Sequence, residues 1–407
     1  MSLLGGDLAW SEAAEAELDA TIALRRAIHA DPELGLDCPR TSAKLKDALA
    51  GLPLTIRDSK ATSGFIARLD GTRPGRTVLL RGDMDALPIH EETGLDFASG
   101  TAGHMHACGH DTHSAMLASA ARILCGQREQ LGGTILFMFQ PGEEGMHGAR
   151  HMIAEGLLDD PAPEAAFALH VFPNMPGGVV ACREGPLLAS ADTVAATIRG
   201  RGGHAAMPHD AIDPVPIACE AVLALQSWVA RRTTFTDPAV LSITRIAGGT
   251  AHNVIPDEVE LLGTMRTLSD KTRAATRDAF ERIVGKIAEA HAASAETRID
   301  EGYPPTVNDR RAVALVRQLA AEQFGDGAYV EIPAPIMGAE DFSYVLQNVP
   351  GAMAFLGVAP PTGDASSRAP IHNSKMIVDE SILPRGVAMH CAFATRFLER
   401  GWDQKGE

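Results

Sequence analysis

The sequence lacks the features that mark several large classes of protein. Lys and Arg number 36 against 52 Asp and Glu, which gives a formal net charge of −16. A nucleic-acid-binding protein needs a basic face, and binding to an anionic membrane needs one too. No apolar run approaches the roughly 20 residues of a membrane span. We therefore expect neither nucleic acid nor membrane as a partner.

Cysteine and aromatic residues are also scarce. The six cysteines are scattered over 407 residues, and aromatic residues make up 5% of the chain. Such scattered cysteines do not resemble a disulfide framework, and the N-terminal residues have no basic segment followed by an apolar run. We therefore expect a reduced, cytoplasmic protein. The other fractions, 45% hydrophobic and 22% charged, are typical of a globular chain with two or three domains.

The order of apolar patterns predicts an α/β fold. Strand-like runs at 64–69, 77–81, 134–139 and 165–169 alternate with helical patterns at 10–30, 41–50 and 114–124. This alternation predicts a mostly parallel sheet flanked by helices, as in hydrolase-like catalytic domains.

The pattern changes within 186–302 to strand, helix, two strands and helix. This change predicts an inserted α+β domain of ferredoxin-like type. The catalytic domain would then consist of 1–185 and 303–407.

One segment concentrates metal-binding side chains. Residues 104–113 contain four histidines, one cysteine and one aspartate, and imidazole and thiolate are ligands that suit zinc and its first-row neighbours. Cys108 and His110 offer two ligands from one loop, and Gly109 allows a tight turn between them.

Other candidate ligands follow apolar runs elsewhere in the chain. Glu143 and Glu144 come after 134–139, His170 follows 165–169, and His372 precedes the last helical pattern. In α/β sheets, ligands bind beyond the carboxyl ends of the strands. A set of five ligands is enough for two metal ions when one ligand bridges them, and two adjacent carboxylates need such a cation nearby. The ligand set would be Cys108, His110, Glu144, His170 and His372.

The ordered motifs resemble those of a known family. They lie at 26–34, 81–89, 106–111, 140–145, 170–173, 202–209, 253–257, 337–342 and 371–373. The chain resembles the hippurate hydrolase, aminoacylase and auxin–amino acid conjugate hydrolase group of dinuclear metallo-amidohydrolases, which are related to dinuclear zinc carboxypeptidases. The resemblance covers nearly the whole chain.

The resemblance implies roles for the metal-binding motifs. Cys108 would bridge two metal ions, with His110 and His170 completing one coordination sphere. Glu144 and His372 would complete the other. In addition, Glu143 would be the general base. Asp85 would orient the metal ligands without binding the metal itself.

The resemblance also implies a role for 186–302 as a lid and dimerisation module. His204 would reach the active site of the other subunit of a homodimer and polarise the scissile carbonyl. Asn253 and Arg266 would help to hold the substrate carboxylate, and Gly338 would also lie at the substrate.

These roles predict hydrolysis of an N-acyl amino acid to a carboxylic acid and a free amino acid. The cofactor would be two divalent ions per subunit, with Mn²⁺ or Zn²⁺ foremost and Co²⁺ or Ni²⁺ as further candidates. Three alternatives stay open: a dipeptidase or carboxypeptidase of the same fold, a hydrolase with Cys108 as nucleophile, and a non-catalytic binding protein.

Several polar residues near the ligands have ordinary structural interpretations. Asp111 is expected to cap the helix that begins nearby, and Asp83 fits a turn at the end of a strand. His104 is interpreted as structural. For His106 and His113 two roles remain open: a structural role, or orienting the metal ligands without binding the metal.

Overall fold

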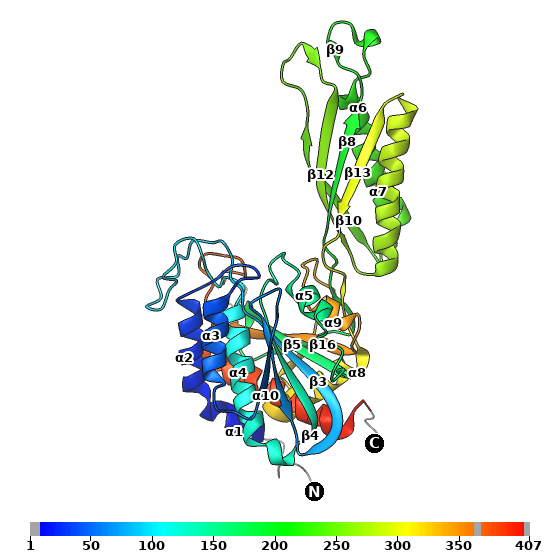
Figure 1. Ribbon diagram of the computed structural model, residues 1–407. Coiled ribbons are helices and arrows are strands. Elements are labelled where there is room, and N and C mark those ends of the chain that lie inside the picture. The colour runs from blue at the N-terminus through cyan, green and yellow to red at the C-terminus, as the bar shows by residue number, and fades with distance from the viewer. Residues whose placement is uncertain (1–8, 362–367, 403–407) are drawn as a thin grey trace. The chain divides into compact units, whose positions relative to one another are not determined.

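The computed structural model describes residues 9–361 and 368–402, which form two compact units (Figure 1). The first unit comprises the described residues up to 187, residues 307–334, and the described residues from 344 onward. The second unit comprises residues 188–306 and 335–343. Among the described residues, no helix has both the length and the hydropathy required to cross a membrane.

The first unit is built on an eight-stranded mixed sheet. Its strand order is β1-β2-β4-β3-β5-β16-β6-β15. The four neighbouring strands β4, β3, β5 and β16 are mutually parallel, and antiparallel pairs occur toward both edges. The strands are β1 (Thr55–Asp58), β2 (Phe65–Asp70), β3 (Arg73–Asp83), β4 (Gly132–Gln140), β5 (Ala165–Pro176), β6 (Val180–Cys182), β15 (Tyr329–Glu331) and β16 (Gly351–Ala359). The predicted mostly parallel sheet is therefore confirmed.

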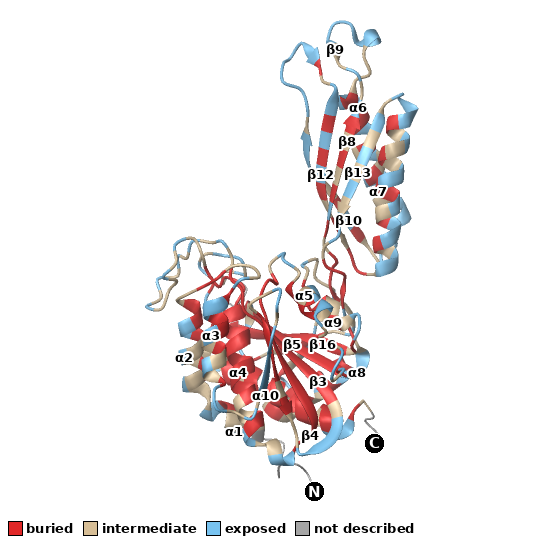
Figure 2. Cartoon of the chain, in the orientation of Figure 1, coloured by how far each residue is buried: buried red, intermediate tan, exposed pale blue. Residues whose placement is uncertain are grey.

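Helices pack around this sheet and bury it. The longer helices are α1 (Ala9–Ala16), α2 (Leu18–His29), α3 (Pro39–Ala48), α4 (His110–Gly126), α8 (Arg310–Phe324) and α10 (Leu383–Arg400). Strand β16 is buried along its whole length, and β4 is buried except at its first residue (Figure 2). Continuous burial explains why these strands read as unbroken apolar runs. Helix α4 is almost fully buried because its side chains are mostly small or apolar.

The second unit has the order strand, helix, two strands, helix and strand, which is that of a ferredoxin-like fold. Its antiparallel sheet has the strand order β10-β12-β8-β13, and α6 and α7 pack on it over their own apolar core. The elements in chain order are β8 (Asp192–Arg199), α6 (Pro214–Arg232), β10 (Ala239–Ala247), β12 (Glu258–Thr267), α7 (Asp270–Ala290) and β13 (Ser294–Asp300). The sequence pattern missed β13, because its residues alternate only between exposed and half-buried positions.

The remaining short elements complete the chain. A second small sheet in the second unit pairs β9 (Gly203–His204) with β11 (Val254–Ile255). The others are η1 (Arg128–Gln130), α5 (Gly148–Ala154), β7 (Gly185–Leu188), η2 (Pro208–Asp210), β14 (Thr306–Asn308), α9 (Ser343–Leu346) and η4 (Glu380–Ile382).

Two local expectations around the ligands are corrected by the structure. His110 is not a loop residue but the first residue of α4, which begins four residues before the predicted start. His170 does not follow the strand but lies inside β5, which continues to Pro176. Both elements therefore extend beyond their apolar runs and include buried polar residues.

Candidate metal centre

A tight turn brings Cys108 and His110 against the central sheet. Gly109 between them has φ +86°, a left-handed conformation that favours glycine. A Cβ atom added to Gly109 would lie 2.4 Å from Cγ2 of Val171 on β5. Glycine is therefore needed twice here, for the backbone conformation and for the close approach of the turn to β5.

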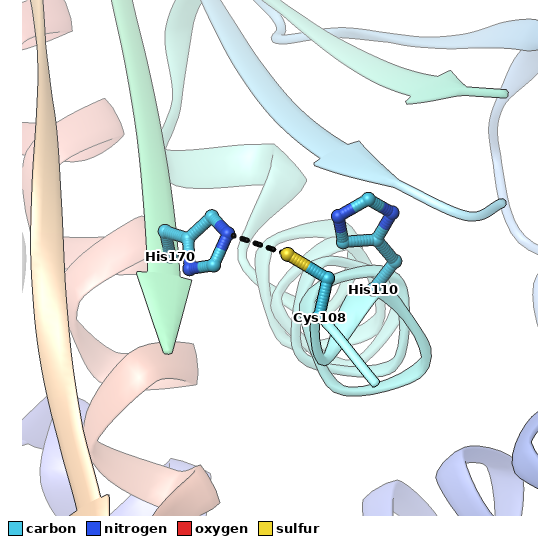
Figure 3. A group of neighbouring side chains, drawn as sticks. All are labelled: Cys108, His110 and His170. Atoms are coloured by element: carbon cyan, nitrogen blue, oxygen red, sulfur yellow. Dashed lines mark hydrogen bonds between the residues drawn. The ribbon is translucent and has the colours of Figure 1, made fainter. Parts of the chain in front are cut away.

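This approach brings Cys108 and His110 together with His170. Sγ of Cys108 lies 3.3 Å from Nε2 of His170, and the side chains converge from the turn, the start of α4 and β5 (Figure 3). Donor atoms of Cys108, His110 and His170 all lie within 4.8 Å of one another, and all three residues are buried. Nδ1 of His170 lies 2.8 Å from the carbonyl oxygen of Val171 and can only donate to it, so Nε2 of the neutral ring faces the sulfur without a proton.

A second group shares Cys108 with the first. Donor atoms of Cys108, Glu144 and His372 also lie within 4.8 Å of one another, and Nε2 of His372 is 3.3 Å from Oε1 of Glu144. His372 comes from the loop before α10 and has φ +63°, which is uncommon for a residue other than glycine. Its backbone N–H donates to the carbonyl of Ala107 at 2.7 Å. The structure thus brings the five predicted ligands into one cluster with Cys108 at its centre.

Asp85 connects the glutamate turn to His110. The carboxylate of Asp85 accepts the backbone N–H groups of Glu143 at 3.0 Å and Glu144 at 3.1 Å. Its Oδ1 atom is also 3.4 Å from Nδ1 of His110. Asp85 is buried two residues beyond the end of β3, and it fixes the backbone that carries both carboxylates.

The negative groups of the cluster favour positive charge on two of its histidines, as expected for a site that binds a cation. Although burial disfavours the imidazolium, the charges of Asp83 and Cys108 raise the pKa of His110 well above its ordinary value. Contacts with Cys108 and then Glu144 raise the pKa of His372 to about 10. Protons on these rings occupy places that a metal ion would take, because metal binding displaces protons from its ligands.

Unsatisfied polar atoms show that the residues fit a metal ion. Both ring nitrogens of His110 and Oε1 of Glu144 are buried. Charged groups lie 3.3–3.5 Å from them, but these three atoms form no hydrogen bond with any described residue. Buried polar atoms without a partner are costly and rare. A pair of divalent cations would satisfy them, and the thiolate, imidazole and carboxylate donors suit Zn²⁺ or Mn²⁺.

Three residues near the cluster have contacts that the sequence did not reveal. Asp111 does not cap α4, because its carboxylate contacts Nε of Arg25 at 2.8 Å and Nδ1 of His29 at 2.9 Å. Asp83 is fully buried and bound to other side chains, so it is not a simple turn residue. His113 is also buried and contacts Asp83. The only sequence signal for these contacts is the pair of aspartates at positions 83 and 85.

The second unit brings two of the other predicted site residues together. His204 on β9 is paired with Val254 on β11, and the N–H of Ala205 donates to the carbonyl of Asn253 at 3.1 Å. Both His204 and Asn253 are exposed. Nδ1 of His204 accepts the N–H of Ala206 at 3.1 Å, so the neutral ring carries its proton on Nε2.

Arg266 and Gly338 lie at the other end of the second unit. Arg266 is the penultimate residue of β12. The carbonyl of the next residue, Thr267, accepts the backbone N–H of Ser190, and the N–H of Thr267 donates to Oγ of Ser190. The carbonyl of Gly338 accepts the N–H of neighbouring Ala189 at 2.8 Å. His204 lies beyond the opposite end of β12, which is about 27 Å away at the usual rise per residue. The structure therefore separates Arg266 and Gly338 from His204 and Asn253 within this unit.

Comparisons with known proteins agree with the resemblance. The profile of Peptidase family M20/M25/M40 matches residues 79–396. IAA-amino acid hydrolase ILR1-like 2 of Arabidopsis thaliana is 39% identical over 94% of this chain and 86% of its own length. Thermostable carboxypeptidase 1 of Saccharolobus solfataricus is 37% identical over 94% of this chain and 96% of its own length.

A solved structure extends the agreement to three dimensions. The Bacillus subtilis YXEP protein, described as a dinuclear metal binding peptidase from the M20 family, superimposes with a TM-score of 0.81. It is 33% identical, and the match covers 95% of this chain and 99% of that one. These matches confirm the resemblance seen in the motifs: the chain belongs to Peptidase family M20/M25/M40 and is a metallo-amidohydrolase.

Proposed function

We propose that this enzyme hydrolyses the amide bond of N-acyl amino acids with two divalent ions held by Cys108, His110, Glu144, His170 and His372. The observation that carries the proposal is the pair of donor groups that share Cys108 and lie beside the glutamate turn. Mn²⁺ and Zn²⁺ are the foremost candidates, followed by Co²⁺ and Ni²⁺. The six cysteines are free thiols, which supports a reduced, cytoplasmic setting.

The chain's own residues supply the proton transfers. Bound divalent ions act as Lewis acids and lower the pKa of water toward neutrality. Glu143 takes a proton from the attacking water as the new C–O bond forms at the amide carbonyl. The same carboxyl group then gives that proton to the departing nitrogen as the C–N bond breaks. The products are a carboxylic acid and an amino acid.

His204 is suited to stabilise the oxyanion that develops on the carbonyl oxygen. Its neutral ring carries the proton on Nε2, as the hydrogen bond from Ala206 to Nδ1 requires. An exposed N–H donor of this kind can donate to the oxyanion in the transition state. Asn253, on the adjacent chain segment, would then contact the same substrate.

The separation within the second unit supports a homodimer with shared active sites. A small substrate cannot touch Arg266 and His204 of one chain when about 27 Å of β12 lies between their positions. We infer that one active site takes Arg266 and Gly338 from one chain and His204 from the other, with Arg266 pairing with the substrate carboxylate. His204 and Asn253 serve the site of the partner chain, so the second unit acts as lid and dimerisation module.

A carboxypeptidase activity is the second candidate function. It is favoured by the 37% identity to thermostable carboxypeptidase 1. Both candidate reactions cleave an amide whose nitrogen belongs to an amino acid with a free carboxylate. They differ in the acyl side, which is a simple acyl group in one case and a peptide in the other.

The test is amine release from a panel of N-acetyl amino acids, N-benzoyl amino acids and dipeptides. Metal-free protein is resupplied separately with Mn²⁺, Zn²⁺, Co²⁺ or Ni²⁺. Metal-dependent turnover of the N-acyl amino acids supports the proposal, and preference for the peptides favours the carboxypeptidase. Turnover that resists chelators but is blocked by a thiol alkylator would instead support Cys108 as nucleophile. Stoichiometric binding of metal and of N-acyl amino acid without turnover would support a binding protein.

A further inference from the structure

His113 is a buried histidine that the proposed reaction does not use. It lies on α4 three residues after His110, so the two side chains lie on the same side of the helix. Nε2 of His113 accepts the backbone N–H of Val171 at 2.9 Å. An amide N–H group can only donate, so Nε2 of His113 carries no proton.

The other ring nitrogen has an equally defined partner. Nδ1 of His113 lies 2.6 Å from Oδ1 of Asp83, and Arg81 donates to Oδ2 of the same carboxylate at 2.6 Å. All three side chains are buried. The proton of neutral His113 is therefore on Nδ1 and is donated to Asp83. Arg81 and Asp83 on β3 thus hold the ring in one orientation.

The pairing of the strands explains why the backbone N–H of Val171 needs a side chain as its acceptor. Strand β3 pairs with β5 only from Val78 to Arg81, and its last partner on β5 is Ala168. Strand β5 continues beyond this ladder, and the N–H of Val171 is accepted by His113 instead of by a strand. Gly82 allows this approach, because an added Cβ atom would lie 3.0 Å from the carbonyl oxygen of His113.

Val171 in turn holds the candidate ligand His170. Its carbonyl accepts Nδ1–H of His170 at 2.8 Å, which leaves Nε2 directed at Cys108. The rings of His113 and His170 are also in contact, with centroids 4.6 Å apart. The backbone of Val171 therefore links the two histidines. Its N–H is held by His113, and its carbonyl holds His170.

We propose that His113 is a positioning residue that sets the tautomer and ring orientation of His170 through the backbone of Val171. The inference deepens the proposed function, since it rests on His170 as a metal ligand. Outer partners of metal-bound histidines typically change metal affinity by roughly 10–100-fold when they are lost. Loss of His113 should weaken the ion that His170 holds more than the ion held by Glu144 and His372.

The test compares zinc binding by wild type, His113→Phe and His113→Gln, measured by competition with a chromophoric chelator. The phenylalanine keeps a ring but removes both polar contacts, and we expect it to weaken one of two zinc equivalents by roughly 10–100-fold. An amide presents an acceptor and a donor, so His113→Gln should recover most of the affinity. The control is His390→Phe, another buried histidine, whose Nδ1 has no hydrogen-bond partner among the described residues; this variant should bind both equivalents normally.

A second measurement on the wild type decides the question even if His113→Phe does not fold. Long-range ¹H–¹⁵N spectra of histidine-labelled protein, as purified and after zinc loading, report which ring nitrogen carries each proton. We expect His113 and His170 both protonated on Nδ1. A His113 ring protonated on Nε2, or a His113→Phe protein with both zinc affinities unchanged, overturns the inference. If wild type binds no zinc pair, the proposed function fails instead, and the tautomer of His113 still tests the positioning role.

Discussion

Sγ of Cys108 and Nε2 of His170 lie 3.3 Å apart although the two residues are 62 positions apart in the chain. The contact depends on Gly109, whose missing side chain lets the turn reach β5 beside Val171. Cys108 also belongs to the group with Glu144 and His372. A cysteine common to two donor groups is what a bridging ligand requires.

Replacing Glu143 by Gln should remove turnover but not metal. A glutamine cannot accept a proton from water, and loss of a general base costs roughly 10²–10⁴-fold in rate. Metal content per subunit, measured by plasma emission, should stay at the wild-type value because Glu144 is retained. The exposed Glu129→Gln is the control. Substantial activity in a metal-replete Glu143→Gln protein would remove Glu143 from the base role.

Replacing Asp85 by Asn should lower kcat/KM by roughly 10–100-fold, the usual cost of losing an outer partner of a metal site. The carboxylate accepts two backbone N–H groups, those of Glu143 and Glu144, whereas one end of an amide is itself a donor. Exposed Asp58→Asn, on β1, provides the comparison. Wild-type kinetics and metal affinity in Asp85→Asn would show that these backbone contacts do not position the site.

Mixing two inactive variants tests whether active sites are shared. Glu143→Gln lacks the base but keeps His204, and His204→Ala has the opposite defect. After exchange of subunits, about a quarter of wild-type activity should return, because about half of the dimers are mixed and each mixed dimer has one intact site. Glu143→Gln mixed with His110→Ala should recover nothing, since both defects then lie in the first unit. No recovery in the first mixture would place His204 in its own chain's site or outside catalysis.

Peroxide should inactivate the enzyme through Cys108. A thiolate that bridges two ions loses its ligand character on oxidation, so activity and bound metal should fall together. Cys219 is exposed on α6, and it is expected to react without consequence. Mass spectrometry of the Cys219→Ser protein follows the oxidation state of Cys108 against activity. Unchanged activity and an unmodified Cys108 after peroxide treatment would contradict this expectation.

His29 should stabilise the first unit in a pH-dependent way. Burial lowers the pKa of His29, but Asp111 and Glu91, at 2.9 and 3.2 Å, outweigh this effect and raise the pKa to about 9. Because the folded-state pKa is raised, the stabilisation is fully present below pH 6.5 and is lost as pH rises through about 9.

Urea unfolding of wild type and His29→Gln, measured between pH 6 and pH 10, tests this dependence. The difference in the free energy of unfolding should be roughly 2–3 kcal/mol larger at pH 6 than at pH 10. His151→Gln, a change elsewhere in the first unit, should run parallel to wild type throughout. A difference between wild type and His29→Gln that does not change with pH would show that His29 is neutral when folded.

The donor chemistry and the fold class can be predicted from residue types and their order. Whether a side chain can bind a metal depends on its residue type alone, as for Cys108, His110, Glu144, His170 and His372. The order of the motifs specified the family. Apolar runs predicted the strands because a strand buried on both faces needs apolar side chains at every position. The role of 186–302 as lid and dimerisation module, and the role of each site residue, stay predictions.

The partners of each polar group, in contrast, depend on how distant segments pack in three dimensions. The link from Asp83 through His113 to Val171, and the bonds of Asp111 to Arg25 and His29, join segments far apart in the chain. Such links depend on strand register and on where a ladder ends, as at Arg81, and no local pattern encodes these features. The protonated nitrogen of a histidine is set by such partners, because imidazole alone does not favour one tautomer strongly enough to fix it in a protein.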